Sequence, residues 1–188
     1  MFMAVIFKKH TEAICLKKDA LHKGILSAVL LALGIVLPLL TGQIKEIGDS
    51  LLPMHLPVLF CGMLCGCGYG ATVGAVLPFL RAIIFSMPPL YPNAIWMALE
   101  LMTYGLTAGI FYKLLKKRGI VGIYVSLIGA MLCGRVVWGI SKAILLGLSG
   151  KAFGMGAFVA GAFIDSALGI IIQLLIIPPI VKITEKRL

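Results

Sequence analysis

Ile120–Leu148, with the sequence IVGIYVSLIGAMLCGRVVWGISKAILLGL, is a long apolar run and a strong indication of the fold. A helix needs about 20 apolar residues to cross the hydrocarbon core of a bilayer, and this run is longer than that. Its charged side chains are Arg135 and Lys142. We therefore expect a membrane-spanning helix that carries two cations at membrane depth.

Further apolar runs lie on both sides of this one, and the chain is 61% hydrophobic. A soluble domain is about 45–50% apolar, so the composition indicates an all-α membrane protein. The other runs are Gly24–Leu40, about Leu56–Gly68, about Gly70–Phe85, Ala94–Leu115 and Gly154–Ile183. The two runs between Leu56 and Phe85 are short, so counting them as one would give five spans instead of six.

The charge pattern decides between five and six spans. The formal net charge is +10, from 17 Lys and Arg against 7 Asp and Glu. Most of these cations flank the apolar runs. The flanking cations are Lys8, Lys9, Lys17, Lys18, Lys23, Lys113, Lys116, Lys117, Arg118, Lys182, Lys186 and Arg187. Six spans put all of them on one side, as the positive-inside rule requires. We therefore expect six transmembrane helices with both termini in the cytoplasm, and no nucleic-acid binding.

The N-terminal residues have a composition of their own. We expect residues 1–20 to form a basic interfacial segment, followed by a six-helix transmembrane domain over residues 21–188. Met1–Phe7 is apolar, but it is too short for a signal peptide and is followed by charge. The five cysteines lack the neighbours of a metal site and the spacing of a disulfide framework, so we expect packing roles and no metal or cofactor.

Five charged side chains lie inside the apolar runs, away from the Lys and Arg that mark the ends: Arg81, Glu100, Arg135, Lys142 and Asp165. Each costs roughly 2.5–3.5 kcal/mol to insert at membrane depth, so such residues usually serve a function. Counting about 1.5 Å per residue from the helix ends places Arg135 and Asp165 in a deep layer and the others above them. We expect Arg135 to pair with Asp165. One upper cation then either meets a small anionic ligand or extends to the lipid headgroups.

Aromatic side chains share helix faces with these charges. Arg135, Trp138 and Lys142 are spaced by three and four residues, and Trp96 and Glu100 by four. Aromatic walls with a few convergent polar groups are typical of small-molecule pockets. The predicted ligand-binding residues are Glu100, Arg135, Trp138, Lys142, Trp96, Asn93, His55 and Arg81. The proline-rich loop 87–93 is expected to be a lid or a rigid connector.

Several short motifs occur along the chain: Leu52-Pro-Met-His-Leu-Pro-Val-Leu-Phe-Cys-Gly, Tyr69-Gly, Met87-Pro-Pro, Glu100-Leu and Tyr104-Gly-Leu. They resemble the motifs of the substrate-binding S components of energy-coupling factor (ECF) transporters, and the likeness extends over roughly residues 20–183. The likeness is closest to the pantothenate and related vitamin branch. This resemblance implies six transmembrane helices and capture of a water-soluble vitamin, pantothenate in the first place, at the outer face of the bacterial plasma membrane.

The same resemblance implies partners. In the family, an Ala-xxx-Ala strip on the first helix docks onto a transmembrane coupling subunit that is carried by two ATPases, and Ala28 and Ala32 match this strip. The expected partners are therefore a vitamin, membrane lipid and this coupling module. The sequence contains no nucleotide-binding motif of its own.

Other functions stay open at this stage. The chain can be an S component for pyridoxine, folate, a thiamine precursor or a queuosine precursor, or a stand-alone proton-coupled carrier in which Glu100 or Asp165 titrates. An intramembrane enzyme using Glu100, Asp165 or His55 is disfavoured, because there is no paired acidic or His-Glu-xx-His motif. We expect no catalytic residues.

Overall fold

A computed structural model describes residues 2–39, 51–148, 150 and 154–185, with side chains from Lys18 onward. All regular structure in these ranges is helical, which confirms the all-α prediction for the described part. The helices are α1 Phe2–Val36, α3 His55–Cys65, α4 Cys67–Phe85, α5 Ile95–Leu115, α6 Gly119–Leu148, α7 Met155–Val159 and α8 Ala167–Glu185. Short turns of 3-10 or π helix are η1 Leu37–Leu39, η2 Leu90–Ala94, η3 Lys116–Arg118 and η4 Ala160–Ile164.

Within the described residues, 4 helical stretches are long and apolar enough to cross a membrane: Lys18–Leu39, Cys67–Phe85, Leu90–Leu148 and Met155–Glu185. The third stretch contains both α5 and α6, which are joined by the η3 turn. The apolar helix α3 has 11 residues, so it is only about 16 Å long. These helices make the chain a multi-pass membrane protein.

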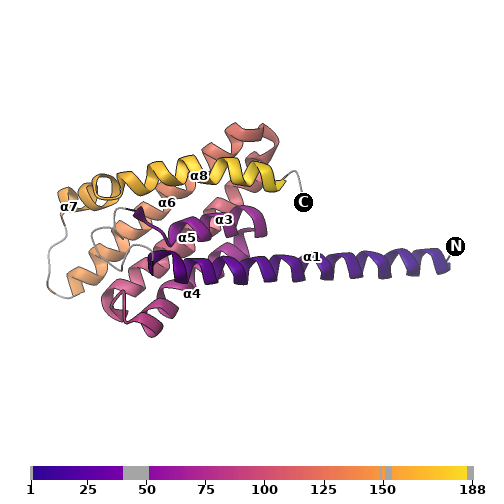
Figure 1. Cartoon of the computed structure of the whole chain (residues 1–188), viewed down its shortest axis with the longest axis horizontal. Helices are drawn as coiled ribbons and strands as arrows, with labels where there is room; N and C mark the ends of the chain where they lie inside the picture. The colour runs from indigo at the N-terminus through magenta and orange to yellow at the C-terminus, as the bar shows by residue number, and fades with distance from the viewer. Residues whose placement is uncertain (1, 40–50, 149, 151–153, 186–188) are drawn as a thin grey trace.

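Helix α1 runs without a break from Phe2 to Val36, and its N-terminal part projects beyond the other helices (Figure 1). The predicted boundary near residue 20 therefore does not separate two elements of structure. The physical reason is in the sequence, because no glycine or proline occurs between Phe2 and Lys23 to end a helix. The basic N-terminal segment is an extension of the first spanning helix.

One helix boundary falls where the sequence suggested, and one differs from the prediction. Gly66 separates α3 from α4 and has a φ of 106°, a conformation that favours glycine; it is the first residue of the glycine-rich stretch 66–70 expected to join these two runs. The predicted sixth helix is not continuous, because the π turn η4 lies between α7 and α8. A π turn inserts an extra residue into a helical turn and is frequent at functional sites.

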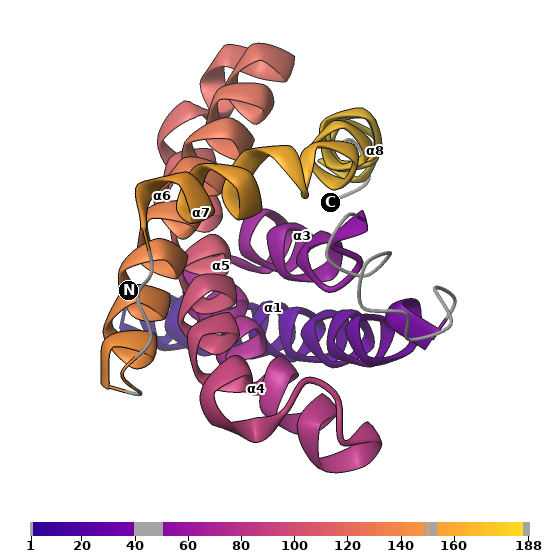
Figure 2. The same ribbon diagram turned by 90° about the vertical axis from the view of Figure 1, so that its left-hand side faces the viewer.

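Helix α3 lies at the centre of the bundle, packed against α1, α4, α5 and α8 (Figure 2). Glycines permit this close packing. A Cβ on Gly105 of α5 would collide with the backbone of Gly70 in α4, and a Cβ on Gly70 would lie 2.5 Å from the Cα of Gly62 in α3. In lipid, small residues at helix interfaces let backbones approach and gain dispersion contacts. The middle of the bundle is therefore closed.

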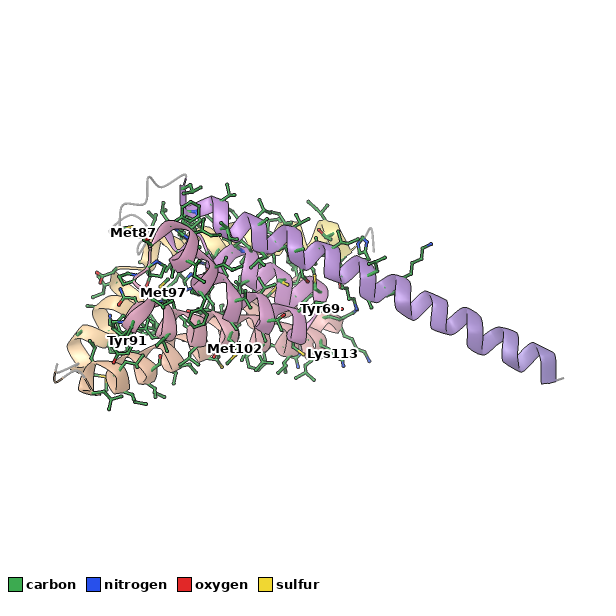
Figure 3. All side chains as sticks on the ribbon, turned by 90° about the horizontal axis from the view of Figure 1, so that it is seen from below. Tyr69, Met87, Tyr91, Met97, Met102 and Lys113 are labelled. Carbon is green, nitrogen blue, oxygen red and sulfur yellow. The ribbon has the colours of Figure 1, made fainter. Side chains whose placement is uncertain are left out.

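The two ends of the bundle differ in charge. Figure 3 shows Tyr69 and Lys113 toward the end from which α1 projects, and Met87 and Tyr91 at the opposite end. The hydroxyl of Tyr69 donates to the carbonyl oxygen of Ala20 at 3.3 Å, which places this part of α1 at the first end too. We call this the basic end, because it carries the exposed cations Lys18, Lys23, Lys113, Lys116, Lys117 and Arg118. The opposite end, where α3 and α5 begin and α4 ends, is called the cavity end.

Candidate ligand-binding site

A cavity of about 440 Å³ lies at the cavity end, with walls from α3, α4, α5, α6 and the segment around η4. Its volume is within the range of small-molecule pockets, roughly 300–1,000 Å³. All eight residues of the predicted site line it: His55, Arg81, Asn93, Trp96, Glu100, Arg135, Trp138 and Lys142. The structure thus brings the predicted residues together, and their contact with a ligand stays a prediction.

An ion pair joins α5 to α6 in this cavity. Nη1 of Arg135 donates to Oε1 of Glu100 at 3.0 Å, and both side chains are buried. The prediction that Arg135 pairs with Asp165 is wrong, because Arg135 pairs with Glu100 and Asp165 is exposed. The depth estimate assumed that α5 and α6 end level at one face. Since Glu100 contacts Arg135, α6 must extend about two turns beyond the start of α5.

His55 is the first residue of α3 and only 3% exposed. The helix can begin here because Pro57 falls in the first turn, where a missing N–H is tolerated. Its Nε2 lies 3.4 Å from Oε1 of Glu100, and its ring meets that of Tyr104 edge-on, with centroids 5.1 Å apart. Neither ring nitrogen has a hydrogen-bond partner among the described residues.

Arg81 approaches the cavity from α4, close to the end of that helix. The residue is only 5% exposed, and its Nε is buried without a hydrogen-bond partner in the described part of the chain. The guanidinium carbon lies 5.9 Å from the centroid of the Phe85 ring. The guanidinium of Arg81 thus lies in the wall of the cavity, and its contact with a ligand stays a prediction.

Lys142 lies against the aromatic walls of the cavity. Its Nζ is 4.4 Å from the centroid of the Trp138 ring and 5.6 Å from that of Trp96. Such cation–π contacts are worth about 0.5–2 kcal/mol. Gly161 in η4 makes room for this arrangement, because a Cβ there would lie 2.8 Å from Cη2 of Trp138. Trp96 is buried in this wall.

Sequence reasoning missed several apolar walls of the cavity. Pro38, Met54 and Met97 line it, together with prolines of the loop before α5. The predicted topology places these residues near the same membrane face as His55, and that is the signal that could have found them. The signal is weak, because an apolar residue near a membrane face is too common to mark a binding site.

A second hollow, of about 300 Å³, lies between α5 and α6. It is lined by aliphatic side chains and Ser141, whose hydroxyl donates to the carbonyl oxygens of Val137 and Trp138 in its own helix. This hollow offers no charge to a water-soluble ligand. The charged cavity is therefore the candidate site.

The family model of the ECF transporter substrate-specific component matches residues 22–181. This match covers most of the chain, so the chain belongs to that family, as the motifs indicated. No curated protein and no solved structure gives a significant match. Members of the family are substrate-binding subunits of transporters and not enzymes, and membership implies a small-molecule substrate and a coupling module with ATPases.

Proposed function

We propose that this S component captures pantothenate, in the charged cavity, at the outer face of the bacterial plasma membrane. The observation that carries the proposal is a set of buried nitrogens without hydrogen bonds in the described part of the chain. Nε of Arg81 and Nη2 of Arg135 are donors, and Nδ1 of His55 lies beside them in the cavity wall. Leaving a buried donor unsatisfied costs about 1–3 kcal/mol. A ligand with a carboxylate and further oxygen acceptors satisfies these donors and recovers that cost.

We propose six membrane crossings with both chain ends in the cytoplasm. The cations of the basic end support this orientation, since positive residues accumulate on the cytoplasmic side. The start of α1 and the end of α8 lie toward this same end (Figure 1). Helix α3 is short for a crossing, but it is surrounded by other helices, where a short helix is tolerated. The basic residues before about residue 20 then lie close to anionic headgroups.

Ala28 and Ala32 are the proposed contact with the coupling subunit. Both residues are exposed on α1, next to the exposed side chains of Ile25 and Val29. Small side chains on an outward-facing helix surface let another membrane helix approach closely. The ATPases attached to that subunit supply the energy for uptake.

The ligand is tested by native mass spectrometry of the detergent-purified chain with an equimolar panel of water-soluble vitamins. We expect one tight adduct with the mass of pantothenate. An adduct with pyridoxine, folate, a thiamine precursor or a queuosine precursor would replace pantothenate as the ligand and keep the binding role. No adduct with any member of the panel contradicts the proposal.

The contact between His55 and Glu100 favours a second candidate, a stand-alone proton-coupled carrier, because a carboxylate and an imidazole in contact can exchange a proton. Uptake into proteoliposomes distinguishes the two. Accumulation that needs the coupling module and ATP supports the S component. Accumulation by the chain alone, driven by a pH gradient, supports the carrier.

A further inference from the structure

The charged groups of the cavity are not equivalent. Glu100 is engaged by the protein itself, since its Oε1 accepts from Arg135 at 3.0 Å and lies 3.4 Å from Nε2 of His55. The side chain of Tyr104 also faces this carboxylate. Glu100 and Arg135 therefore form a closed pair whose charges cancel. Within this pair, Nη2 of Arg135 is a buried donor without a hydrogen-bond partner among the described residues.

Within the part of the chain that the structure describes, Arg81 has no such counter-ion. No carboxylate oxygen of these residues lies within 4.0 Å of it, and Phe85 supplies its ring contact. Two more charged residues line the cavity, Lys142 and Asp165, and their formal charges are opposite. Lys142 is positioned on the faces of Trp138 and Trp96. Among the described residues that line the cavity, Arg81 is thus the surplus charge, and it is buried.

We propose that Arg81 is the counter-ion for a single negative charge on the ligand, while the Glu100–Arg135 pair contacts a neutral polar group of the same ligand. This inference rests on the proposed capture of a carboxylate and specifies how its charge is recognised. A neutral ligand leaves Arg81 uncompensated. A second negative charge would face Glu100, with no further cation to balance it. The cavity therefore selects monoanions over both neutral and dianionic analogues.

An uncompensated guanidinium inside a membrane protein destabilises the ligand-free state, because burial removes its hydration without supplying an opposite charge. This consequence does not depend on knowing the ligand. Removing Arg81 should make the empty protein more stable, whereas removing Arg135 strands the carboxylate of Glu100 and should make it less stable.

The first experiment is thermal unfolding of the full-length, ligand-free chain in detergent, with Arg81→Gln, Arg135→Gln and Arg118→Gln compared. Arg118 is exposed at the basic end, so its variant controls for the loss of one arginine. We expect a higher unfolding temperature for Arg81→Gln, a lower one for Arg135→Gln and little change for Arg118→Gln. A decrease for Arg81→Gln like that for Arg135→Gln would overturn the inference, because Arg81 would then have a structural partner.

The second experiment measures binding by tryptophan fluorescence, since both tryptophans of the chain, Trp96 and Trp138, line the cavity. The probes are pantothenate, its neutral alcohol panthenol, and 4′-phosphopantothenate, which adds a phosphate. We expect the unmodified chain to bind pantothenate at least about tenfold more tightly than either analogue, the size of a charge-assisted contact. Arg81→Gln should abolish the preference over panthenol, and Arg118→Gln should keep it.

The outcomes separate this inference from the proposed function. If pantothenate is preferred by the Arg81→Gln variant as strongly as by the unmodified chain, the inference is wrong and the proposed ligand stands. If none of the three probes binds but the unfolding temperatures follow the expected pattern, pantothenate is wrong and the role of Arg81 as an unpaired counter-ion is supported.

Discussion

The middle of the bundle and the cavity end are built from the same three helices but have opposite interiors. In the middle, Gly62 of α3, Gly70 of α4 and Gly105 of α5 bring the backbones into contact. At the cavity end, α3, α4 and α5 instead contribute His55, Arg81 and Glu100 to a hollow lined with charge. Close backbone packing in the middle of the bundle thus fixes the helices that hold the polar side chains apart at the cavity end.

The contrast between the closed middle and the hollow cavity end indicates how a small membrane protein accommodates buried charge. Helices locked by backbone contact cannot move together to fill the hollow, because side chains would clash before the gap closed. Donors that remain unsatisfied in the empty cavity are then available to a ligand at little reorganisation cost. Substitutions in the two regions should therefore have different consequences, and the following predictions are ordered by expected size.

The largest effect is expected from the ion pair. Glu100→Gln leaves Arg135 buried without its counter-ion, and breaking a buried pair from one side costs about 3–5 kcal/mol. Chemical unfolding in detergent micelles measures this loss. Replacing both partners, as Glu100→Leu with Arg135→Met, should recover most of the stability, because no isolated charge remains. If the single and the double variant lost equal stability, the loss in the single variant would not come from an uncompensated charge on Arg135.

The next effect is expected in the middle of the bundle. Gly105→Ala places a methyl group against the backbone of Gly70, and overpacking of this kind costs about 1–3 kcal/mol. Gly68→Ala is the matched control, because a Cβ at Gly68 meets nothing within 4 Å. The control should be neutral or slightly stabilising by helix propensity. Thermal unfolding of both variants makes the comparison, and equal stability would mean that the glycine contact is dispensable.

A smaller effect is expected for Lys142→Met. Because Nζ of Lys142 lies on the faces of Trp138 and Trp96, its loss should loosen the aromatic wall and weaken pantothenate binding by about 1 kcal/mol. Isothermal titration calorimetry measures the affinity of the Lys142→Met and Arg81→Gln variants for pantothenate. The loss of affinity should be larger for Arg81→Gln. A greater loss for Lys142→Met than for Arg81→Gln would make Lys142 the partner of the ligand charge.

The smallest effect on the isolated chain is expected for Ala28→Trp, since Ala28 is exposed and remote from the cavity residues. Ligand binding should be unchanged, while copurification with the coupling module should be lost. Leu132→Trp, on the exposed surface of α6, serves as the control for a bulky substitution. Normal assembly of the Ala28→Trp variant would show that the alanine strip is not the docking surface.

Much of the fold could be predicted from the sequence, because helices in lipid are specified locally. The ends of α4, α5 and α6 agree with the apolar runs within a residue or a few, since charge and glycine mark them. The break between α3 and α4 falls at Gly66, inside the glycine-rich stretch that was expected to join them, whereas the π turn η4 was not predicted. That turn depends on how a residue fits its neighbours, since η4 packs Gly161 against Trp138.

The charged and aromatic residues of the candidate site were predicted from the sequence, but the ion pair between them was not. Helical spacing placed Arg135, Trp138 and Lys142 on one face, and all three line the cavity. The partner of Arg135 was predicted wrongly, because distance along a helix axis does not show how far one helix is displaced along its neighbour. That displacement joins Arg135 to Glu100 and leaves Asp165 exposed.

Sequence alone was enough to predict an all-α membrane protein of the S component family, the position of most helices and the charged and aromatic residues that line the cavity. These properties follow from hydrophobicity, charge and local spacing, which act over one or two helical turns. Which charges cancel, and which described residue is left without an opposite charge, depends on how the helices are placed against one another. Glu100 of α5 supplies a carboxylate to the guanidinium of Arg135. Among the described residues, no helix supplies a carboxylate to the guanidinium of Arg81.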